Sequence, residues 1–264
     1  QAEPHLRGAD QLAWLARLSA EAEEIDLALH RAVAARDAAT AHRLVAGVAW
    51  SWAIRGYNDE AMRWIPLVHG LDGPVPPHAR ALTTAFLILA RLGDEDVTAA
   101  TRLVEDAVRL AAQLPEPLHP VLRLMPPVRT LFAADDPGPL RALAAAPDSD
   151  IWLRAASMGV MAAYAGNAGR IDEQRTLARA AHALATEVGD RFILGMVVLS
   201  LGELEDVAGH HDAAAAAFDE AIELATELAN DEDLPQFVAR RAMLEARRGD
   251  LDAARAGLER ARTV

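Results

Sequence analysis

Three glycines, Gly169, Gly209 and Gly249, stand forty residues apart, and a polar turn sequence follows each of them (GRIDE, GHHDA and GDLDA). Glycine placed just past a helix adopts the left-handed conformation that ends the helix at little cost. The segment LATEV at 184–188 recurs as LATEL at 224–228, so the same period extends beyond the turns. The spacing predicts a helix, a tight turn and a second helix, repeated three times.

The residues at fixed offsets after each glycine are mostly small or apolar. Small residues allow two helix axes to lie close together, and a larger residue between them fills the gap between neighbouring pairs. Each pair alone leaves an apolar face exposed, so we expect several pairs to stack. Five, nine and twelve residues after the glycines lie Gln174, Ala214 and Ala254; Ala178, Phe218 and Leu258; and Ala181, Ala221 and Ala261.

The composition favours helices, because 52% of the residues are hydrophobic, mainly Ala and Leu, and only 5% are aromatic. Two degenerate copies of the repeat precede the three clear ones, with turn glycines at Gly56 and Gly93. The order of turn glycine, Ala, large apolar residue and Ala resembles the tetratricopeptide repeat, most clearly in LGELEDVAGHHDAAAAAFDEAI at 201–222. We predict an all-α, tetratricopeptide-like superhelical solenoid of about thirteen antiparallel helices.

We divide the chain into three stretches. Residues 1–114 are expected to hold an N-terminal capping helix, at about Asp10 to Arg36, followed by degenerate repeats, and residues 149–264 hold the three clear repeats. Residues 115–148 connect them, with prolines at 115, 117, 120, 126, 127, 137 and 139. Interior proline disrupts a helix, so only short helices are predicted there. One continuous solenoid is expected, and two packed subdomains remain the alternative.

Charge and missing residue types exclude several functions. The formal net charge of −13 opposes direct binding to nucleic acid or to an anionic membrane. All 26 basic residues are arginine, and without lysine a P-loop or a Schiff base cannot form. Cysteine is absent, which fits a reducing cytoplasm. No apolar run is long enough for a membrane span, and no catalytic motif is present, so we expect a cytoplasmic non-enzyme without a bound metal or cofactor.

The first sixty-five residues resemble the segment that follows the ATPase module in large bacterial transcription regulators. These are the antibiotic-regulatory (SARP) proteins and the large ATP-binding LuxR-type activators, mostly of actinobacteria. The resemblance implies a C-terminal sensor domain that receives a signal or partner, with ATP and DNA bound only by upstream domains. It rests on Trp14, Leu15, Leu27, Leu29, the run 41–44, Trp50, Trp52, Arg55, Gly56, Glu60, Arg63 and Trp64.

The resemblance to tetratricopeptide arrays also suggests where a ligand binds, since the first helix of each pair lines a concave groove in such arrays. A groove with Arg and Trp at one end and acids at the other suits a protein or peptide. A small effector and an association of copies of the chain are compatible with it. Counting back from the turn glycines gives Arg43, Trp50, Arg80, Thr83, Asn167, Met196, Glu203, Asp206, Gln236, Met243 and Arg247 as candidate groove residues.

Three smaller groups allow a ligand-binding or a structural interpretation, and the structural one is favoured for each. Tryptophans at helical spacing usually pack in a core, adjacent histidines lack the i, i+4 spacing of a metal site, and acids on an amphipathic helix usually face solvent. The groups are Trp50, Trp52 and Trp64; His210, His211 and Asp212; and Glu23, Asp26 and His30. Two rival functions stay open: a free-standing tetratricopeptide adaptor, and a small-molecule enzyme within a helical toroid.

Overall fold

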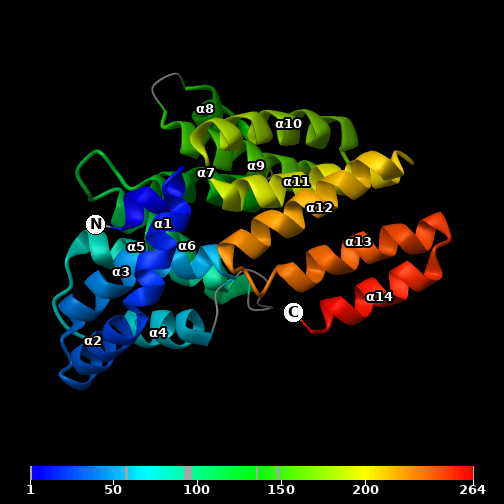
Figure 1. Ribbon diagram of the computed structural model, residues 1–264. Helices are drawn as coiled ribbons and strands as arrows, with labels where there is room; N and C mark the ends of the chain where they lie inside the picture. Colours follow the sequence, from blue (N-terminus) through cyan, green and yellow to red (C-terminus); the bar gives the residue numbers. More distant parts are fainter. Residues whose placement is uncertain (1, 57–58, 92–96, 135, 147–148, 264) are drawn as a thin grey trace. The chain divides into compact units, whose positions relative to one another are not determined.

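The computed structural model describes residues 2–56, 59–91, 97–134, 136–146 and 149–263, without the side chains of 97–100 and 132–134. In these residues all regular structure is helical, with one short 3-10 helix, η1 (Glu3–Arg7), and fourteen α-helices (Figure 1). The predicted all-α helical-repeat fold is therefore confirmed. The predicted turn glycine Gly93 lies outside the described residues.

The helices fall into two compact units. Unit 1 comprises Gln1–Leu6 and Asp10–Leu140, and unit 2 comprises Arg7–Ala9 and Arg141–Val264. Their boundary lies inside the proline-rich stretch 115–148, in the short helix α8 (Gly138–Ala145). A single continuous solenoid stays a prediction, and each unit is described by itself.

In unit 1, helix α3 is central, because it packs against α2, α4 and α5, while α5 also packs against α6 and α7. Its helices are α1 (Gln11–Ala20), α2 (Ala22–Ala34), α3 (Ala38–Ile54), α4 (Asp59–His69), α5 (Pro77–Ala90), α6 (Val97–Ala111) and α7 (Pro120–Ala134). The degenerate copy around Gly56 is a true helix pair: Gly56 has φ of 89° between α3 and α4, and Ala61, Ile65 and Val68 of α4 are buried.

In unit 2, helices pack in the order of the sequence, so that each contacts the helix before it and the helix after it. The three predicted repeats are the pairs α9 and α10, α11 and α12, and α13 and α14 (Figure 1). Their bounds are α9 (Ile151–Asn167), α10 (Ile171–Val188), α11 (Arg191–Val207), α12 (His211–Leu228), α13 (Leu234–Arg248) and α14 (Leu251–Ala261).

Both kinds of turn in unit 2 follow the forty-residue period. Within the pairs, Gly169, Gly209 and Gly249 have φ of 71°, 79° and 88°, as predicted. Between the pairs, Gly189 ends α10 with φ of 78°, and Ala229, forty residues later, ends α12 with φ of 51°. Alanine is strained in this left-handed conformation, because its Cβ approaches the following carbonyl. The repeat therefore imposes its turn geometry even where glycine is absent.

The predicted capping helix from Asp10 to Arg36 is wrong in one respect, since it is broken at Glu21 into α1 and α2. The Ser19 hydroxyl donates to the Leu15 carbonyl at 2.9 Å, and Arg55 donates to the same carbonyl at 3.2 Å and to Ser19 Oγ at 2.6 Å. Side chains that compete for helix carbonyls bend or end a helix. The break accounts for fourteen helices where about thirteen were expected.

The prediction of only short helices between 115 and 148 is also wrong, because α7 runs for 15 residues through Pro126 and Pro127. Each interior proline costs about 3 kcal/mol. The apolar face of α7 offsets this cost by burial, with Leu122, Met125 and Leu131 each at most 4% exposed. Pro120 starts the helix, where a missing N–H is harmless.

Candidate functional site

The first helices of the three repeats in unit 2 carry a row of exposed side chains, which we call the first-helix face. It contains predicted groove residues from all three helices. Met196 and Met243 are each 43% exposed. Val207 is 79% exposed and belongs to the same face, although it was not predicted. It stands forty residues after Asn167 of α9 and forty before Arg247 of α13, which are both exposed, so the period alone could have identified it. The face comprises Asn167, Met196, Val207, Gln236, Met243 and Arg247.

The two predicted acids of this face, Glu203 and Asp206, are paired with arginines of the next repeat. Arg240 of α13 lies 3.1 Å from Glu203 of α11, and Arg247 forms an ion pair with Asp206. The Asp206 side chain is only 7% exposed. The expected acidic end of a groove is therefore largely neutralised from within the array. What remains for a ligand is a surface of two methionines bordered by ion pairs.

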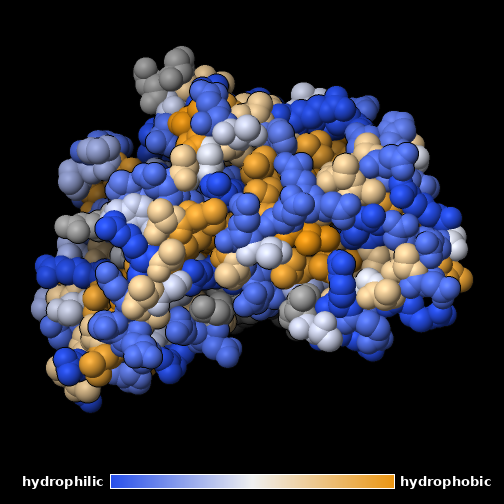
Figure 2. Space-filling view, in the orientation of Figure 1, coloured by the Kyte–Doolittle hydropathy of each residue, from blue (hydrophilic) through white to orange (hydrophobic). Residues whose placement is uncertain are grey.

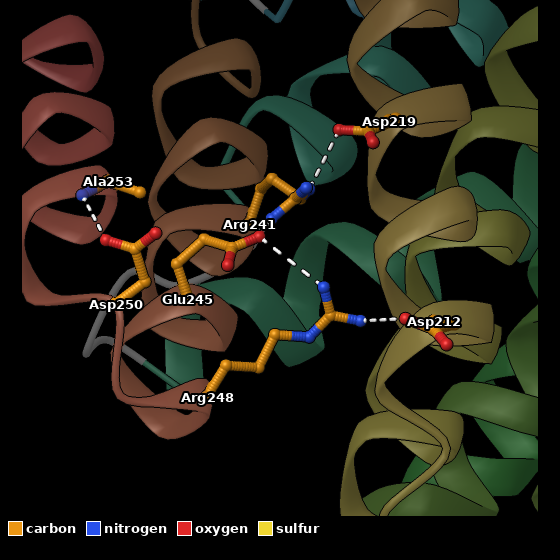
Figure 3. Close-up of polar contacts among 7 residues, drawn as sticks. All are labelled: Asp212, Asp219, Arg241, Glu245, Arg248, Asp250 and Ala253. Atoms are coloured by element: carbon orange, nitrogen blue, oxygen red, sulfur yellow. Dashed lines mark hydrogen bonds and ion pairs between the residues drawn. The ribbon is translucent and has the colours of Figure 1, made fainter.

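A second set of ion pairs joins α12 to α13 (Figure 3). Arg241 of α13 donates to Asp219 of α12 at 2.9 Å and also to Glu245, while Arg248 lies 2.5 Å from Asp212 and 3.8 Å from Glu245. Burial lowers the pKa of Arg241, but the hydrogen bond to Glu245 and the charge of Asp219 hold it above its ordinary value. In the space-filling view, hydrophobic side chains gather along this seam between hydrophilic ones (Figure 2).

Two of the turn residues, His210 and Asp212, take part in similar pairs, which agrees with the structural interpretation. His210 Nδ1 lies 2.7 Å from Glu205, which also accepts from Arg175 at 2.6 Å. The hydrogen bond from His210 lowers the pKa of Glu205, and the charge of Arg175 adds to this effect. Across the residues that the structure describes, no group of three or more His, Asp or Glu side chains is arranged to hold a metal ion.

The three tryptophans of the predicted cluster are core residues of unit 1, as the structural interpretation predicted. Trp50, Trp52 and Trp64 are 6%, 7% and 2% exposed. The Trp64 indole N–H donates to Asp26 at 3.1 Å, and Arg63 pairs with the same carboxylate. Asp26 therefore ties α2 to α4 while its side chain remains 36% exposed, and Glu23 and His30 are exposed as predicted. Edges of Trp52 and Trp64 border a small cavity between α2, α3 and α4, together with Asp26, Ser51, Arg55 and Glu60.

Of the predicted groove residues in unit 1, only Arg43 is exposed. Thr83 is fully buried and Trp50 nearly so, which corrects their placement on a groove surface. The physical reason is a buried histidine. His42 Nδ1 lies 3.0 Å from Thr83 Oγ1, and Arg80 lies 3.4 Å from His42 Nε2. The degenerate repeat here turns Arg80 and Thr83 inward to satisfy this ring.

The hydrogen bonds identify the protonation state of His42. Arginine can only donate, so Nε2 accepts from Arg80, and Nδ1 carries the proton that is donated to Thr83. Burial lowers the pKa of His42 to about 4, and the charge of Arg80 adds to the effect. Burial and the positive charge of Arg80 also lower the pKa of the neighbouring His69. The His42 ring is thus neutral at pH 7, and its contacts with Arg80 and Thr83 join α3 to α5.

Known proteins offer one kind of likeness. The crystal structure of BtubC (BKLC) from P. vanneervenii matches with a TM-score of 0.53, covering 89% of this chain and 90% of that chain, at 16% sequence identity. No protein-family model and no curated protein matches the sequence. Among the described residues, no helix is both long and apolar enough to cross a membrane. At 16% identity the likeness concerns the fold, and the chain is a helical-repeat protein of the all-α class.

Proposed function

We propose that this chain is the C-terminal sensor and protein-interaction domain of a bacterial transcription regulator of the actinobacterial type. In this proposal the first-helix face binds a protein, a peptide or a small effector. Binding then controls upstream domains that hydrolyse ATP and bind DNA. The chain itself holds no cofactor and catalyses no reaction, and it acts in the cytoplasm.

The observation that carries the binding role is the regular exposure of the first-helix face. Met196 and Met243 are the same residue type at about the same exposure on neighbouring first helices. Methionine side chains are flexible and polarisable, so they adapt to varied partners. The flanking pairs, Glu203 with Arg240 and Asp206 with Arg247, hold α11 and α13 in register. Such a face suits an amphipathic helix or an extended peptide.

The regulator role is supported by the resemblance in the first sixty-five residues. In the structure its aromatic residues are mostly packing residues, since Trp50, Trp52 and Trp64 are buried and Arg55 holds the end of α1. Trp50 and Trp52 lie on α3, around which unit 1 is built, and Trp64 lies on α4. A shared set of packing residues supports a shared architecture for this segment. The link to transcription is inferred from that architecture.

The reading frame upstream of the codon for Gln1 in the native gene tests the regulator role. A frame that continues through a lysine-containing P-loop and a basic winged-helix segment is the expected result. A start codon immediately before Gln1 would contradict the proposal. It would favour the free-standing adaptor, whose partner should then protect the first-helix face.

In the full-length regulator, Met243→Glu should change the rate of ATP hydrolysis, because it places a charge on the proposed binding face. The matched control is Ile171→Glu on α10, since Ile171 is 41% exposed and Met243 is 43% exposed. The control should hydrolyse ATP at the wild-type rate. Equal rates for all three proteins, with the effector or partner present, would exclude a regulatory role for the face.

A further inference from the structure

The last helix, α14, repeats the positions with which α12 holds α13. Forty residues after Asp212, Phe218 and Asp219 lie Asp252, Leu258 and Glu259. On α12, Phe218 is only 1% exposed. On α14, Leu258 is 45% exposed, and the side chains of Asp252 and Glu259 are 98% and 69% exposed. The large apolar side chain is thus packed in one repeat and uncovered in the next, while the acids beside it are exposed in both.

The internal junction shows what such a set binds. Arg241 and Arg248 of α13 are seven residues apart, so they lie two turns apart on one side of the helix, and they pair with Asp219 and Asp212 (Figure 3). Phe237 and Leu244 of the same helix share a core cluster with Phe218. The helix that packs on α12 therefore has the pattern apolar-x3-Arg-x2-apolar-x3-Arg, from 237 to 248.

A hollow on the surface lies between α13 and α14. Its apolar lining includes Ala239, Leu258 and Ala261. Forty residues earlier stand Leu199, Phe218 and Ala221, and all three belong to the core cluster that contains Phe237. The hollow thus has the lining that receives a large apolar side chain in the preceding repeat.

Two residues of the hollow differ from the internal junction. Arg255 and Arg262 stand where α12 has Ala215 and Ile222. They pair with Asp252 at 3.2 Å and with Glu259 at 3.4 Å, in exposed i, i+3 pairs. Such pairs contribute at most about 1 kcal/mol, so a partner can exchange them. The occupant then needs an acid near its arginines, as Glu245 lies beside Arg241 and Arg248 on α13.

We propose that the outer face of α14 is a docking site for an amphipathic helix of a separate protein. The helix carries two arginines seven residues apart, an acid beside them and two large apolar residues in the order found in α13. One apolar side chain enters the hollow between α13 and α14, and the arginines pair with Asp252 and Glu259. The hollow adjoins the first-helix face at Gln236, but the arginine-binding acids lie on α14, and the site does not depend on what that face binds.

The probe is a fluorescently labelled peptide with the sequence of residues 230–249, added to the whole chain and followed by anisotropy. Saturable binding is expected. Reversing both arginines of the peptide to glutamate should weaken it about tenfold or more, because two attractive pairs become repulsive. The chain variant Asp252→Arg with Glu259→Arg should no longer bind the original peptide and should bind the peptide with reversed charges. Leu258→Ala should weaken both.

The matched control is Glu187→Arg with Glu223→Arg, which makes the same change in charge at exposed positions of α10 and α12. It should bind the original peptide like the wild type, and circular dichroism should show every variant folded. Absence of saturable binding would mean that α14 does not dock such a helix and would overturn the proposal. So would binding that ignores the Asp252 and Glu259 reversal, because the peptide would then be replacing α13 on α12.

Sedimentation of the chain without peptide tests the other candidate occupant of this site, a second copy of the chain. The proposal expects a monomer at the concentrations used for the peptide. Self-association that disappears in Leu258→Ala would identify a second copy of this chain as the occupant, and it would overturn the assignment to a separate protein.

Discussion

The two units of the chain join their helices with different side chains. In unit 1, α3 meets α4 and α5 through large aromatic residues and a buried polar cluster, with Trp64 and His42 at most 2% exposed. In unit 2, the helices meet mainly through alanines, such as Ala178, Ala181 and Ala221, each 0% exposed, and through arginine–carboxylate pairs along the seams. Unit 1 thus depends on a few side chains that each bury a large area.

This difference has a general meaning for repeats. Alanines at a fixed period allow helices to approach closely in the same way each time, so the geometry of one pair is copied by the next. Large aromatic residues and a buried histidine require particular partners, and they fix one arrangement that does not recur. Substitutions in the two units should therefore differ in size and in pH dependence.

The largest effect is expected from Trp64→Ala in unit 1, at about 4 kcal/mol of lost unfolding free energy. The residue is 2% exposed, and its indole N–H satisfies Asp26. Trp64→Phe retains most of the apolar contact and should cost less than half as much. Urea denaturation of the two variants measures both. Losses below about 1 kcal/mol for the alanine variant would show that unit 1 does not depend on this side chain.

The next effect depends on pH. The pKa of His42 is lowered to about 4 in the folded chain, below its unfolded value near 6.5. The neutral ring therefore stabilises the fold above the unfolded pKa, and this contribution is lost as the pH falls toward the folded pKa. Between pH 7 and pH 5 the loss is about 2 kcal/mol.

In His42→Gln the amide can still accept from Arg80 and donate to Thr83 but cannot take up a proton. Its unfolding free energy should therefore fall less than that of the wild type over the same interval of pH. Thermal and urea unfolding at several values between pH 7 and pH 5 measure the two slopes. Parallel slopes would mean that His42 takes up its proton equally in the folded and the unfolded chain, so that folding does not lower its pKa.

In unit 2, Gly202→Ala tests the close approach of α11 and α12. An added Cβ would lie 2.7 Å from the buried Phe218 ring, and overpacking of this kind costs about 1–3 kcal/mol, partly offset by the higher helix propensity of alanine. Gly159→Ala on α9 is the control, because its Cβ would meet only Val197 at 4.0 Å. The first variant should melt lower than the wild type and the second higher. A change of melting temperature in the same direction for both variants would contradict this difference in packing between the two positions.

The smallest effects concern the turns. Ala229→Gly should stabilise the chain by about 1 kcal/mol, because it relieves the left-handed strain at φ of 51°. Gly209→Ala should destabilise it by a similar amount, since its φ is 79° and no neighbouring atom would obstruct the methyl group. Melting temperatures of the two single variants provide the measurement. A rise for Gly209→Ala would refute the role of these turns.

Most of unit 2 could be predicted from the sequence, because glycine turns and small residues at one period determine both where helices end and which faces meet. The turns at Gly169, Gly209 and Gly249 and the burial of Phe218 follow from that pattern. The exposure of Leu258 does not, since it depends on what packs beyond α14 and not on the residue itself.

Less of unit 1 and of the candidate site could be predicted. The break at Glu21 arises from Arg55, which lies 34 positions later in the chain and competes for a carbonyl of α1. The burial of Thr83 arises from His42 on another helix. The pairing of Glu203 with Arg240 joins two helices that are not adjacent in sequence. Each of these features depends on how two helices are aligned along their lengths, and a degenerate repeat does not specify that alignment.

The sequential packing of unit 2 has a mechanical consequence. Each helix from α9 to α14 packs mainly against its neighbours in the chain, so pulling on the ends of this unit loads the helix pairs in series. A pair can detach while the others remain folded. Each detachment frees one period of forty residues, and the contour length then grows by about 140 Å. Unit 2 is therefore built to extend in steps and to refold one pair at a time when the load is removed.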